Sequence, residues 1–251
     1  MEEHQSIRRK VKTRTVHYLL RIIIIGTALV QAAYGADTTL TYIPKNAVPL
    51  LPTLRSVQVR LFPDNPIPMY MGALVEQESC ISLTHSKCWA ADSELNTSRE
   101  LGAGLFQITK AYSKNGKVRF DTLADLKKQY PDELLELTWE NIEDRPDLQL
   151  TAGTLLVKQN YDKLYYVPTA FDRMAMTDSA YNGGYGAVVK ARTACGMSKG
   201  CNPNIWFGNV ENYLPQSRAA LYGSRSAYDI NREHVTNVMS LRLWKYRPYL
   251  Y

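Results

Sequence analysis

The sequence has little excess positive charge outside its first residues, and this absence excludes one common function of basic proteins. The 251 residues carry a formal net charge of +6 at pH 7, from 30 Lys and Arg against 24 Asp and Glu. Residues 1–35 hold six of the basic and two of the acidic side chains, a net of +4, which leaves +2 for residues 36–251. A nucleic-acid-binding surface needs its basic side chains on the folded domain. The charge therefore gives no case for nucleic-acid binding.

Histidines and strand patterns are scarce as well. His4, His17 and His234 are scattered along the chain, which argues against a metal cluster and against a histidine-based triad. Alternation of polar and apolar residues is rare, so the fold is expected to be mainly α. The mean hydropathy of −0.30 and the hydrophobic content of 45% are those of a globular protein and exclude a polytopic membrane protein.

The first 36 residues have the organisation of an export signal. A basic segment, residues 8–14, precedes an apolar segment, residues 18–36, that ends in small residues. Ala33 and Gly35 match the small-residue pattern of a signal-peptidase site with cleavage before Ala36. The uninterrupted apolar run is short for a bilayer span. We expect an exported protein of the periplasm or cell envelope, with an uncleaved inner-membrane anchor as the alternative.

Export determines how the four cysteines are interpreted. Cys80 and Cys88 are eight residues apart, and Cys195 and Cys201 are six apart. In an oxidising compartment this spacing favours two local disulfides. The alternative is a metal site made by Cys80, His85 and Cys88, which offers only three ligands in one run.

The chain after the signal divides into an arm and one domain. Residues 36–64 contain prolines and little helical periodicity, so we expect an extended arm. Residues 65–251 are expected to form a single domain. Helical periodicity in this domain is clear over residues 147–165 and 230–246. Glycine-rich or polar segments separate the expected helices.

Two glutamates on one expected helix differ in their neighbours. Tyr70 and Leu74 lie eight and four residues before Glu78. Ile81 follows it by three, so Glu78 lies within an apolar stripe. Glu76 has no comparable apolar neighbours and is expected to be a solvated surface acid. An inward carboxylate is either part of a buried ion pair or a general acid, its pKa raised by desolvation and by the helix C-terminus. Periodicity leaves both interpretations open.

Two later segments narrow the choice. The Glu-Ser pair at residues 78–79 is followed by SRELGAGLFQI at 98–108 and by AYNGGYGAV at 180–188. In this order the three segments resemble the soluble lytic transglycosylases, goose-lysozyme-like enzymes that cleave peptidoglycan. The resemblance is strongest over residues 65–190. It implies a lysozyme-like catalytic domain with a cleft.

Two features depart from the pattern of that family. Leu101 and Gly102 stand where the family usually has Gly-Ala, and Phe106 replaces the usual Met. The segment between Glu78 and Ser98 is about twice as long as is usual in the family, because it contains the first cysteine loop. We expect this insertion to reshape one wall of the cleft and thereby its preference among sugar units.

The resemblance implies a reaction that needs one carboxyl group. A lytic transglycosylase cleaves the MurNAc–GlcNAc β-1,4 bond without water and closes a 1,6-anhydro ring on the muramic acid. Glu78 would protonate the glycosidic oxygen and then accept the proton of the C6 hydroxyl. The expected partner is the glycan strand of peptidoglycan. No cofactor and no metal ion are expected.

The same resemblance assigns supporting roles to other residues. Ser98 and Gln107 would hydrogen-bond to Glu78 or to the sugar. Tyr181 would approach the carboxyl group from across the cleft, and Asn182 would orient an N-acetyl group. The residues expected to shape the site without binding the sugar are Gly104, Leu105, Phe106 and Gly184.

Two other functions stay open at this point. A hydrolytic lysozyme (muramidase) on the same fold would use Asp92, Glu94 or Glu100 to position a water molecule. A non-catalytic glycan-binding component of an envelope apparatus would not need the acid. The presence of Glu78 together with all three segments argues against this second alternative.

Overall fold

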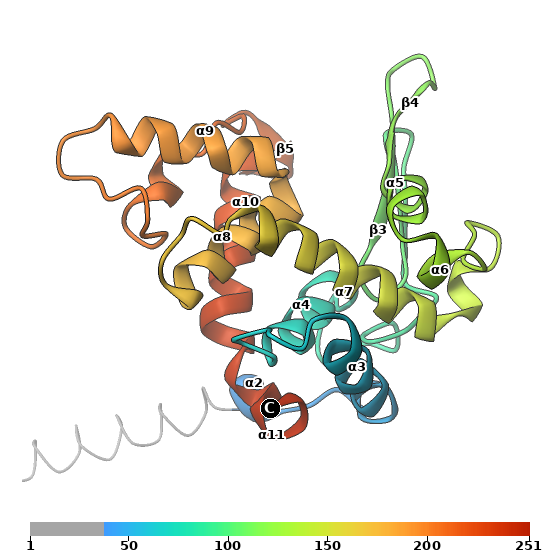
Figure 1. Cartoon of the computed structure of the whole chain (residues 1–251). Coiled ribbons are helices and arrows are strands. Elements are labelled where there is room, and N and C mark those ends of the chain that lie inside the picture. The colour runs from blue at the N-terminus through green and yellow to red at the C-terminus, as the bar shows by residue number, and fades with distance from the viewer. Residues whose placement is uncertain (1–37) are drawn as a thin grey trace, which may run out of the picture. The chain divides into compact units, whose positions relative to one another are not determined.

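Helix α4, Tyr70–Ser79, is the central helix of the fold (Figure 1). Residues 70–76 are all buried, on every side of the helix. Neighbouring elements cover it, with α3 on one side and the C-terminal segments η3 and η4 on another. A helix that is apolar all round is typical of a core position. The last turn of α4, which carries Glu78, reaches a surface cavity.

The computed structural model describes residues 38–251. The expected signal segment lies outside these residues. Contacts divide the chain into a first unit, which ends at Tyr42 and contains the short helix α2, Thr38–Thr41, and a second unit, Ile43–Tyr251. The second unit is mainly helical, as predicted. Within residues 38–251, no helix has the length and apolar character needed to cross a bilayer.

The helices of the second unit pack as a chain of neighbours. α7 contacts both α3 and α8, and α8 contacts both α9 and α10. The helix expected over 147–165 is confirmed as α7. The one expected over 230–246 is confirmed in part, because α10 passes into the π-helix η3 and the 3₁₀-helix η4. The helical elements are α3 Ala47–Leu61, α5 Thr122–Gln129, α6 Pro131–Leu134, η1 Ile142–Asp144, α7 Pro146–Lys163, α8 Ala170–Gly183, α9 Tyr185–Gly196, η2 Val210–Tyr213, α10 Ala227–Thr236, η3 Asn237–Arg242, η4 Trp244–Tyr246 and α11 Arg247–Leu250.

The prediction of an extended arm over residues 36–64 is wrong. Most of this stretch is helix α3, which contains Pro52 in its second turn. A proline there removes one backbone hydrogen bond and disfavours the helix locally. Leu51 and Leu54 are buried, and α3 packs along α7. This tertiary burial outweighs the local cost, which a sequence pattern does not register.

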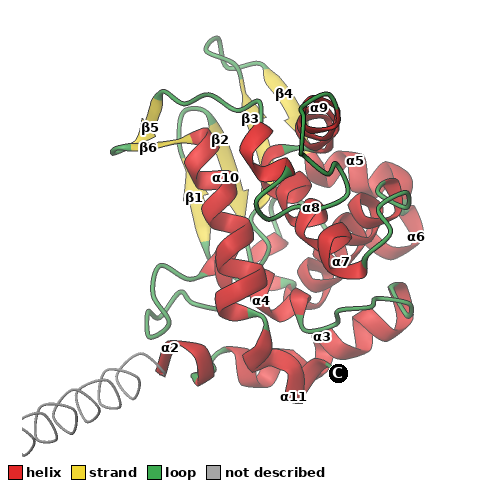
Figure 2. Ribbon diagram, turned by 90° about the vertical axis from the view of Figure 1, so that its left-hand side faces the viewer, coloured by secondary structure: helices red, strands yellow, loops and turns green. Residues whose placement is uncertain are grey.

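Four short strands form an antiparallel sheet in the order β1-β2-β3-β4 beside the helices (Figure 2). Leu95 of β1 pairs with Gly102 of β2, which pairs in turn with Thr109 of β3. The hairpin of β3 and β4 projects beyond the helices (Figure 1). These strands escaped prediction because each has only three to five residues, too few to show a clear alternation of polar and apolar side chains. The strands are β1 Glu94–Asn96, β2 Glu100–Ala103, β3 Ile108–Tyr112, β4 Val118–Asp121, β5 Ala220–Tyr222 and β6 Arg225–Ser226.

Candidate active site

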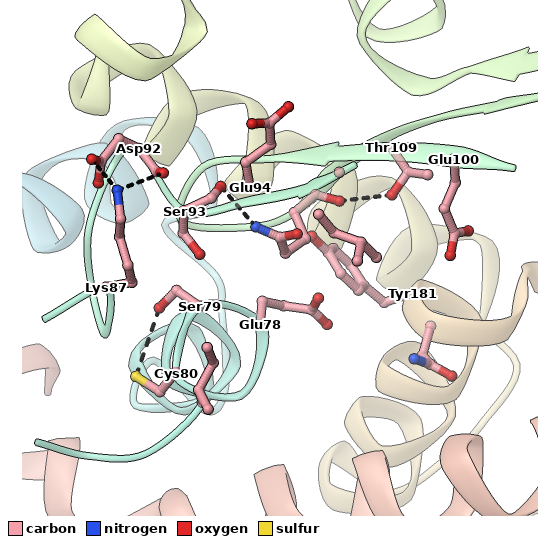
Figure 3. Close-up of a pocket in the computed structure, with 15 residues that line it drawn as sticks. Glu78, Ser79, Cys80, Lys87, Asp92, Ser93, Glu94, Glu100, Thr109 and Tyr181 are labelled. Atoms are coloured by element: carbon pink, nitrogen blue, oxygen red, sulfur yellow. Dashed lines mark hydrogen bonds and ion pairs between the residues drawn. The ribbon is translucent and has the colours of Figure 1, made fainter. Parts of the chain in front are cut away.

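A cavity of about 700 Å³ lies where the end of α4, the first strands of the sheet and the end of α8 meet (Figure 3). Four residues expected in the site line it, namely Glu78, Gln107, Tyr181 and Asn182. The three sequence segments are therefore brought to one place. The complete lining is Glu78, Ser79, Cys80, Ile81, Lys87, Asp92, Ser93, Glu94, Leu95, Glu100, Gly102, Gln107, Thr109, Tyr181 and Asn182.

Glu78 lies in the last turn of α4, and its side chain extends into the cavity toward Tyr181 (Figure 3). Its side chain is 15% exposed, so the carboxyl group is mostly buried yet open to a ligand. Leu74, one turn earlier, is fully buried, as the apolar stripe predicts. Ile81 is not part of that stripe. The helix ends at Ser79, and Ile81 is 83% exposed.

The prediction that Glu76 is a solvated surface acid is wrong. Glu76 is 1% exposed, and its carboxylate lies 2.8 Å from Lys245 Nζ and 3.3 Å from Arg242 Nε. The hydroxyl of Tyr246 donates to it as well. Burial lowers the pKa of Lys245, and the hydrogen bond and charge of Glu76 oppose that effect. Because α4 is surrounded, its second face is buried too, and Glu76 joins the C-terminal segment to the core.

His234 lies directly behind Glu78, although its isolated position in the sequence argued against a histidine-based triad. His234 Nε2 contacts Glu78 Oε1 at 2.6 Å, and His234 Nδ1 contacts Asp178 Oδ2 at 2.7 Å. Tyr70 donates its hydroxyl proton to Asp178 Oδ1 at 2.8 Å. The side chains of His234 and Asp178 are 5% and 0% exposed. Four side chains from three helices thus form one hydrogen-bonded chain from the core to the cavity.

The two carboxylates determine the charge of this chain. Burial alone would lower the pKa of His234, but the charge and hydrogen bonds of Asp178 and Glu78 outweigh it and raise that pKa to about 10. Burial, and then the charge of Asp178, raise the pKa of Tyr70 well above its usual value. Burial and the charge of Glu78 do the same for Tyr181. At neutral pH the ring is therefore an imidazolium, and both tyrosines are neutral.

A capping box at the N-terminus of helix α10 fixes the start of the helix that carries His234. Ser226 and Asp229 form a capping box, in which each side chain accepts the other's backbone N–H at 3.1 Å. The helix then presents Asn231 and His234 on its buried face. Asn231 Nδ2 donates to Asn182 Oδ1 at 2.9 Å, which fixes a residue of the cavity lining. Polar residues on an otherwise apolar helical face were the available signal for this part of the site.

Tyr181 forms the opposite wall and is tied to the sheet segment. Its hydroxyl donates to the carbonyl oxygen of Phe106. Phe106 and Leu105 are fully buried, so Phe106 lies beneath the cavity, as expected. The Phe106 ring packs on Gly153 of α7, where a Cβ atom would lie 2.2 Å from it. Any larger residue at position 153 would displace this wall.

Gln107 shapes the cavity through a strained turn. Gly104 has φ +76°, and a Cβ there would lie 2.3 Å from Gln149 Oε1, so only glycine fits. Gln107 itself has φ +45°, which is rare for a residue with a side chain. Its amide donates at 3.0 Å to the carbonyl oxygens of Ser93 and Gly104. The structure thus places Gln107 in the wall, bonded to backbone rather than to Glu78.

Ser98 was expected to hydrogen-bond to Glu78 or to the sugar, but the structure does not bring it to the cavity. Ser98 is exposed in the turn between β1 and β2 and is not part of the cavity lining. The long segment after Glu78 forms a hairpin that carries Ser98 to its tip, and Ser93 lines the wall instead. Gly184 has φ +88° and joins α8 to α9, outside the lining.

Both predicted disulfides are confirmed, which removes the alternative of a metal site at the first cysteine pair. Cys80 is bonded to Cys88 and Cys195 to Cys201. Among residues 38–251 no group of three or more potential ligands could hold a metal ion. Residues 80–97, the expected insertion, supply seven of the fifteen lining residues. Ser79 Oγ accepts the backbone N–H of Trp89 at 3.0 Å, which anchors this segment to α4.

The cavity is acidic. Glu78, Asp92, Glu94 and Glu100 line it together with one lysine, Lys87, which pairs with Asp92. Such a lining favours positive charge that develops on a bound molecule. A mostly buried carboxyl group, backed by an imidazolium and facing this cavity, is suited to move a proton to and from a ligand. Comparisons with protein-family models, curated proteins and solved structures find no match to this chain.

Proposed function

We propose that the chain is a peptidoglycan lytic transglycosylase with a lysozyme-like catalytic domain. It would cleave the MurNAc–GlcNAc β-1,4 bond and leave a 1,6-anhydroMurNAc end. The observation that carries the proposal is the convergence of three distant segments on one acidic cavity, with Glu78 projecting into it. Residues 78 and 182, at the two ends of this set, lie more than one hundred positions apart in the sequence. A chance match of short motifs gives no reason for such convergence.

Glu78 acts as the single acid and base. It donates a proton to the glycosidic oxygen as the bond from C1 to that oxygen breaks, and the electron pair stays on the leaving sugar. The C6 hydroxyl oxygen of the muramic acid then attacks C1, and its proton passes to Glu78. The positive charge that develops at C1 in between is stabilised by the acidic lining. The nucleophile belongs to the substrate, so one protein carboxyl group is enough.

The remaining lining residues bind and orient the sugar. Tyr181, held against the Phe106 carbonyl, forms a flat wall for a pyranose ring. Asn182, fixed by Asn231, offers its amide to an N-acetyl group. The seven lining residues from the segment 80–97, which do not include His85, form the wall on the other side and set which sugar units are accepted.

Hydrolysis is the second candidate, and one observation favours it. Asp92, Glu94 and Glu100 all line the cavity, and Glu100 lies on the side formed by the sheet (Figure 3). A second carboxylate at a suitable separation would position a water molecule for attack at C1. The product would then be a reducing end in place of an anhydro ring.

Digestion of purified peptidoglycan, followed by mass spectrometry, tests the proposal. We expect products whose muramic ends resist borohydride reduction, because the 1,6-anhydro ring has no free aldehyde. Reducible ends would support hydrolysis instead, and loss of activity in a Glu100→Gln variant would then identify the second carboxylate. Binding of peptidoglycan without any product would contradict both enzymatic functions and support a glycan-binding role.

The proposed substrate requires export. Peptidoglycan lies outside the inner membrane, so the catalytic unit has to cross that membrane. The basic segment 8–14 and the apolar segment 18–36 have the charge order of a translocated signal. The two disulfides are suited to an oxidising compartment. We therefore propose a location in the periplasm or cell envelope.

A further inference from the structure

The two hydrogen bonds of His234 need two protons. A neutral imidazole ring and two ionised carboxylates together hold only one. Each ring nitrogen lies within hydrogen-bond distance of a carboxyl oxygen, Nε2 of Glu78 and Nδ1 of Asp178. A neutral imidazole has one N–H, so with both carboxylates ionised one contact would join two lone pairs. Both contacts become hydrogen bonds only when the three groups hold two protons together. One of these protons therefore lies between His234 and Glu78.

Asp178 holds the other proton on the ring. It has no exposed surface, and it accepts the Tyr70 hydroxyl as well as the ring nitrogen. The charge of Asp178 and its hydrogen bond to the ring raise the pKa of His234. Asp178 thereby fixes the orientation of His234 and keeps its Nδ1 protonated. The proton on the opposite nitrogen is the one that faces the cavity through Glu78.

We propose that the acid of this site is a pair, Glu78 and His234, that shares one proton, with His234 acting as a positioning residue held by Asp178. The proposal rests on the proposed function, because it concerns the source of the proton that cleaves the glycosidic bond. The shared proton passes through Glu78 to the glycosidic oxygen as the bond to C1 breaks. The proton of the C6 hydroxyl returns to the pair as the oxygen closes on C1. Glu78 and His234 therefore hold the same number of protons at the end of the cycle as at its start, the shared proton and the one on His234 Nδ1.

The pair has a chemical advantage over a lone carboxyl group. An ordinary glutamic acid, with a pKa of about 4.3, is almost fully ionised at neutral pH and has no proton to donate. The titratable groups that contact the ring are Glu78 on α4 and Asp178 on α8, and Tyr70 and Tyr181 interact in turn with these two carboxyl groups. All of them are acidic, and none carries a positive charge that would expel the ring proton. The pair therefore stays protonated at the pH of the periplasm or cell envelope.

Nuclear magnetic resonance of the imidazole ring tests the pair without any substrate. We expect the ¹⁵N signals of His234, assigned by their loss in His234→Gln, to stay those of an imidazolium to pH 8 or above. In Glu78→Gln the ring should lose its proton at a pH lower by about one unit or more, because a nearby charge is removed. A His234 ring that titrates near its ordinary pKa of about 6.5 would overturn the proposal. A titration midpoint that is the same in Glu78→Gln as in the wild-type protein would overturn it as well.

The pH dependence of kcat/KM on peptidoglycan separates a proton role from a purely structural one. His234→Gln should shift the alkaline limb of this profile to lower pH by about one unit or more, because Glu78 then lacks the ring with which it shares the proton. His85→Gln, the same substitution at an exposed position outside the lining, should leave the limb in place. A uniform loss of activity with an unmoved limb would contradict the pair.

The two proposals can fail separately. A wild-type protein that produces no cleavage would refute the proposed function, whereas the ring titration would still decide whether the pair exists. If His234→Gln does not fold, Glu78→Gln carries the spectroscopic test, because it alters a partly exposed residue at the end of α4. Asp178→Asn gives a third comparison, since it should lower the ring midpoint as well.

Discussion

Replacing Glu76 with alanine is expected to destabilise the protein strongly. The Lys245 side chain is 1% exposed, and its ammonium group lies 2.8 Å from the Glu76 carboxylate. Without that carboxylate the buried ammonium group loses the negative charge that faces it, and the Tyr246 hydroxyl loses its acceptor. Removing one partner of a buried ion pair costs about 3–5 kcal/mol. For a domain of this size the melting temperature should fall by roughly 6–20 °C.

Thermal unfolding followed by circular dichroism measures this effect, with two variants for comparison. Glu143→Ala removes an exposed acid and should change the free energy of unfolding by less than about 0.5 kcal/mol. Glu76→Gln/Lys245→Met removes the carboxylate and the buried ammonium group together and should recover much of the stability that Glu76→Ala loses, because the remaining cation, Arg242, has a side chain that is 24% exposed to water. Equal melting temperatures for Glu76→Ala and Glu143→Ala would show that the buried ion pair does not hold the C-terminal segment as described. The same would follow if the double variant were the least stable of the three.

Three further results are expected. Burial raises the pKa of Asp121, but hydrogen bonds from Ala124 and Lys110 outweigh that effect and lower the pKa below its usual value. The stabilisation that the ionised Asp121 gives is therefore present above about pH 4 and is lost as the pH falls through the lowered pKa. Asp121→Asn keeps a capping side chain but removes the charge that pairs with Lys110, so it should cost up to about 1 kcal/mol in urea unfolding at pH 7 and progressively less as the pH falls below about 4; equal costs would contradict this. Reducing the disulfides should lower the unfolding free energy by about 2–3 kcal/mol for each, and an unchanged urea midpoint would count against them. A periplasm-dependent reporter fused to residues 1–40 should give signal, with the mature chain starting at or near Ala36; a silent reporter would refute export, and an intact N-terminus at the membrane would favour the anchor.

Local patterns predicted the parts of the fold that local patterns determine. The periodicity over 147–165 indicated α7, although residues 149–155 of that helix are buried on every side rather than on one face. The same reasoning failed for α3. Its prolines favoured a loop, but Leu51 and Leu54 are buried and the helix packs along α7. The strands of the sheet are too short to show a period.

The site divides in the same way. Glu78, Gln107, Tyr181 and Asn182 were predicted to share a site from short segments, and all four line one cavity. The scattered positions of the histidines argued against a histidine-based triad, yet helix packing brings His234 to Glu78. Such a contact depends on tertiary structure. A polar residue on an apolar helical face is the only trace that it leaves in a sequence.

The error over Glu76 has the same cause. Helical periodicity assumes that a helix has one buried face, which holds for a helix at the surface. α4 is buried on all sides up to its last turn, so residues on opposite faces are both inside. The two glutamates are then distinguished by their partners. Glu76 meets two cations and a tyrosine, whereas Glu78 meets a histidine and the cavity.

Digestion of peptidoglycan in water enriched in oxygen-18 tests the central claim most directly. In the proposed reaction the oxygen that closes on C1 comes from the C6 hydroxyl of the substrate itself. Wild-type protein should therefore release muramic ends that contain no heavy oxygen and that lack one water relative to hydrolysed ends. Glu78→Gln should release them at least about two orders of magnitude more slowly, because an amide is too weak an acid to protonate the glycosidic oxygen. One heavy oxygen at C1 of each new end, or full activity in Glu78→Gln, would contradict a single acid and base working without water.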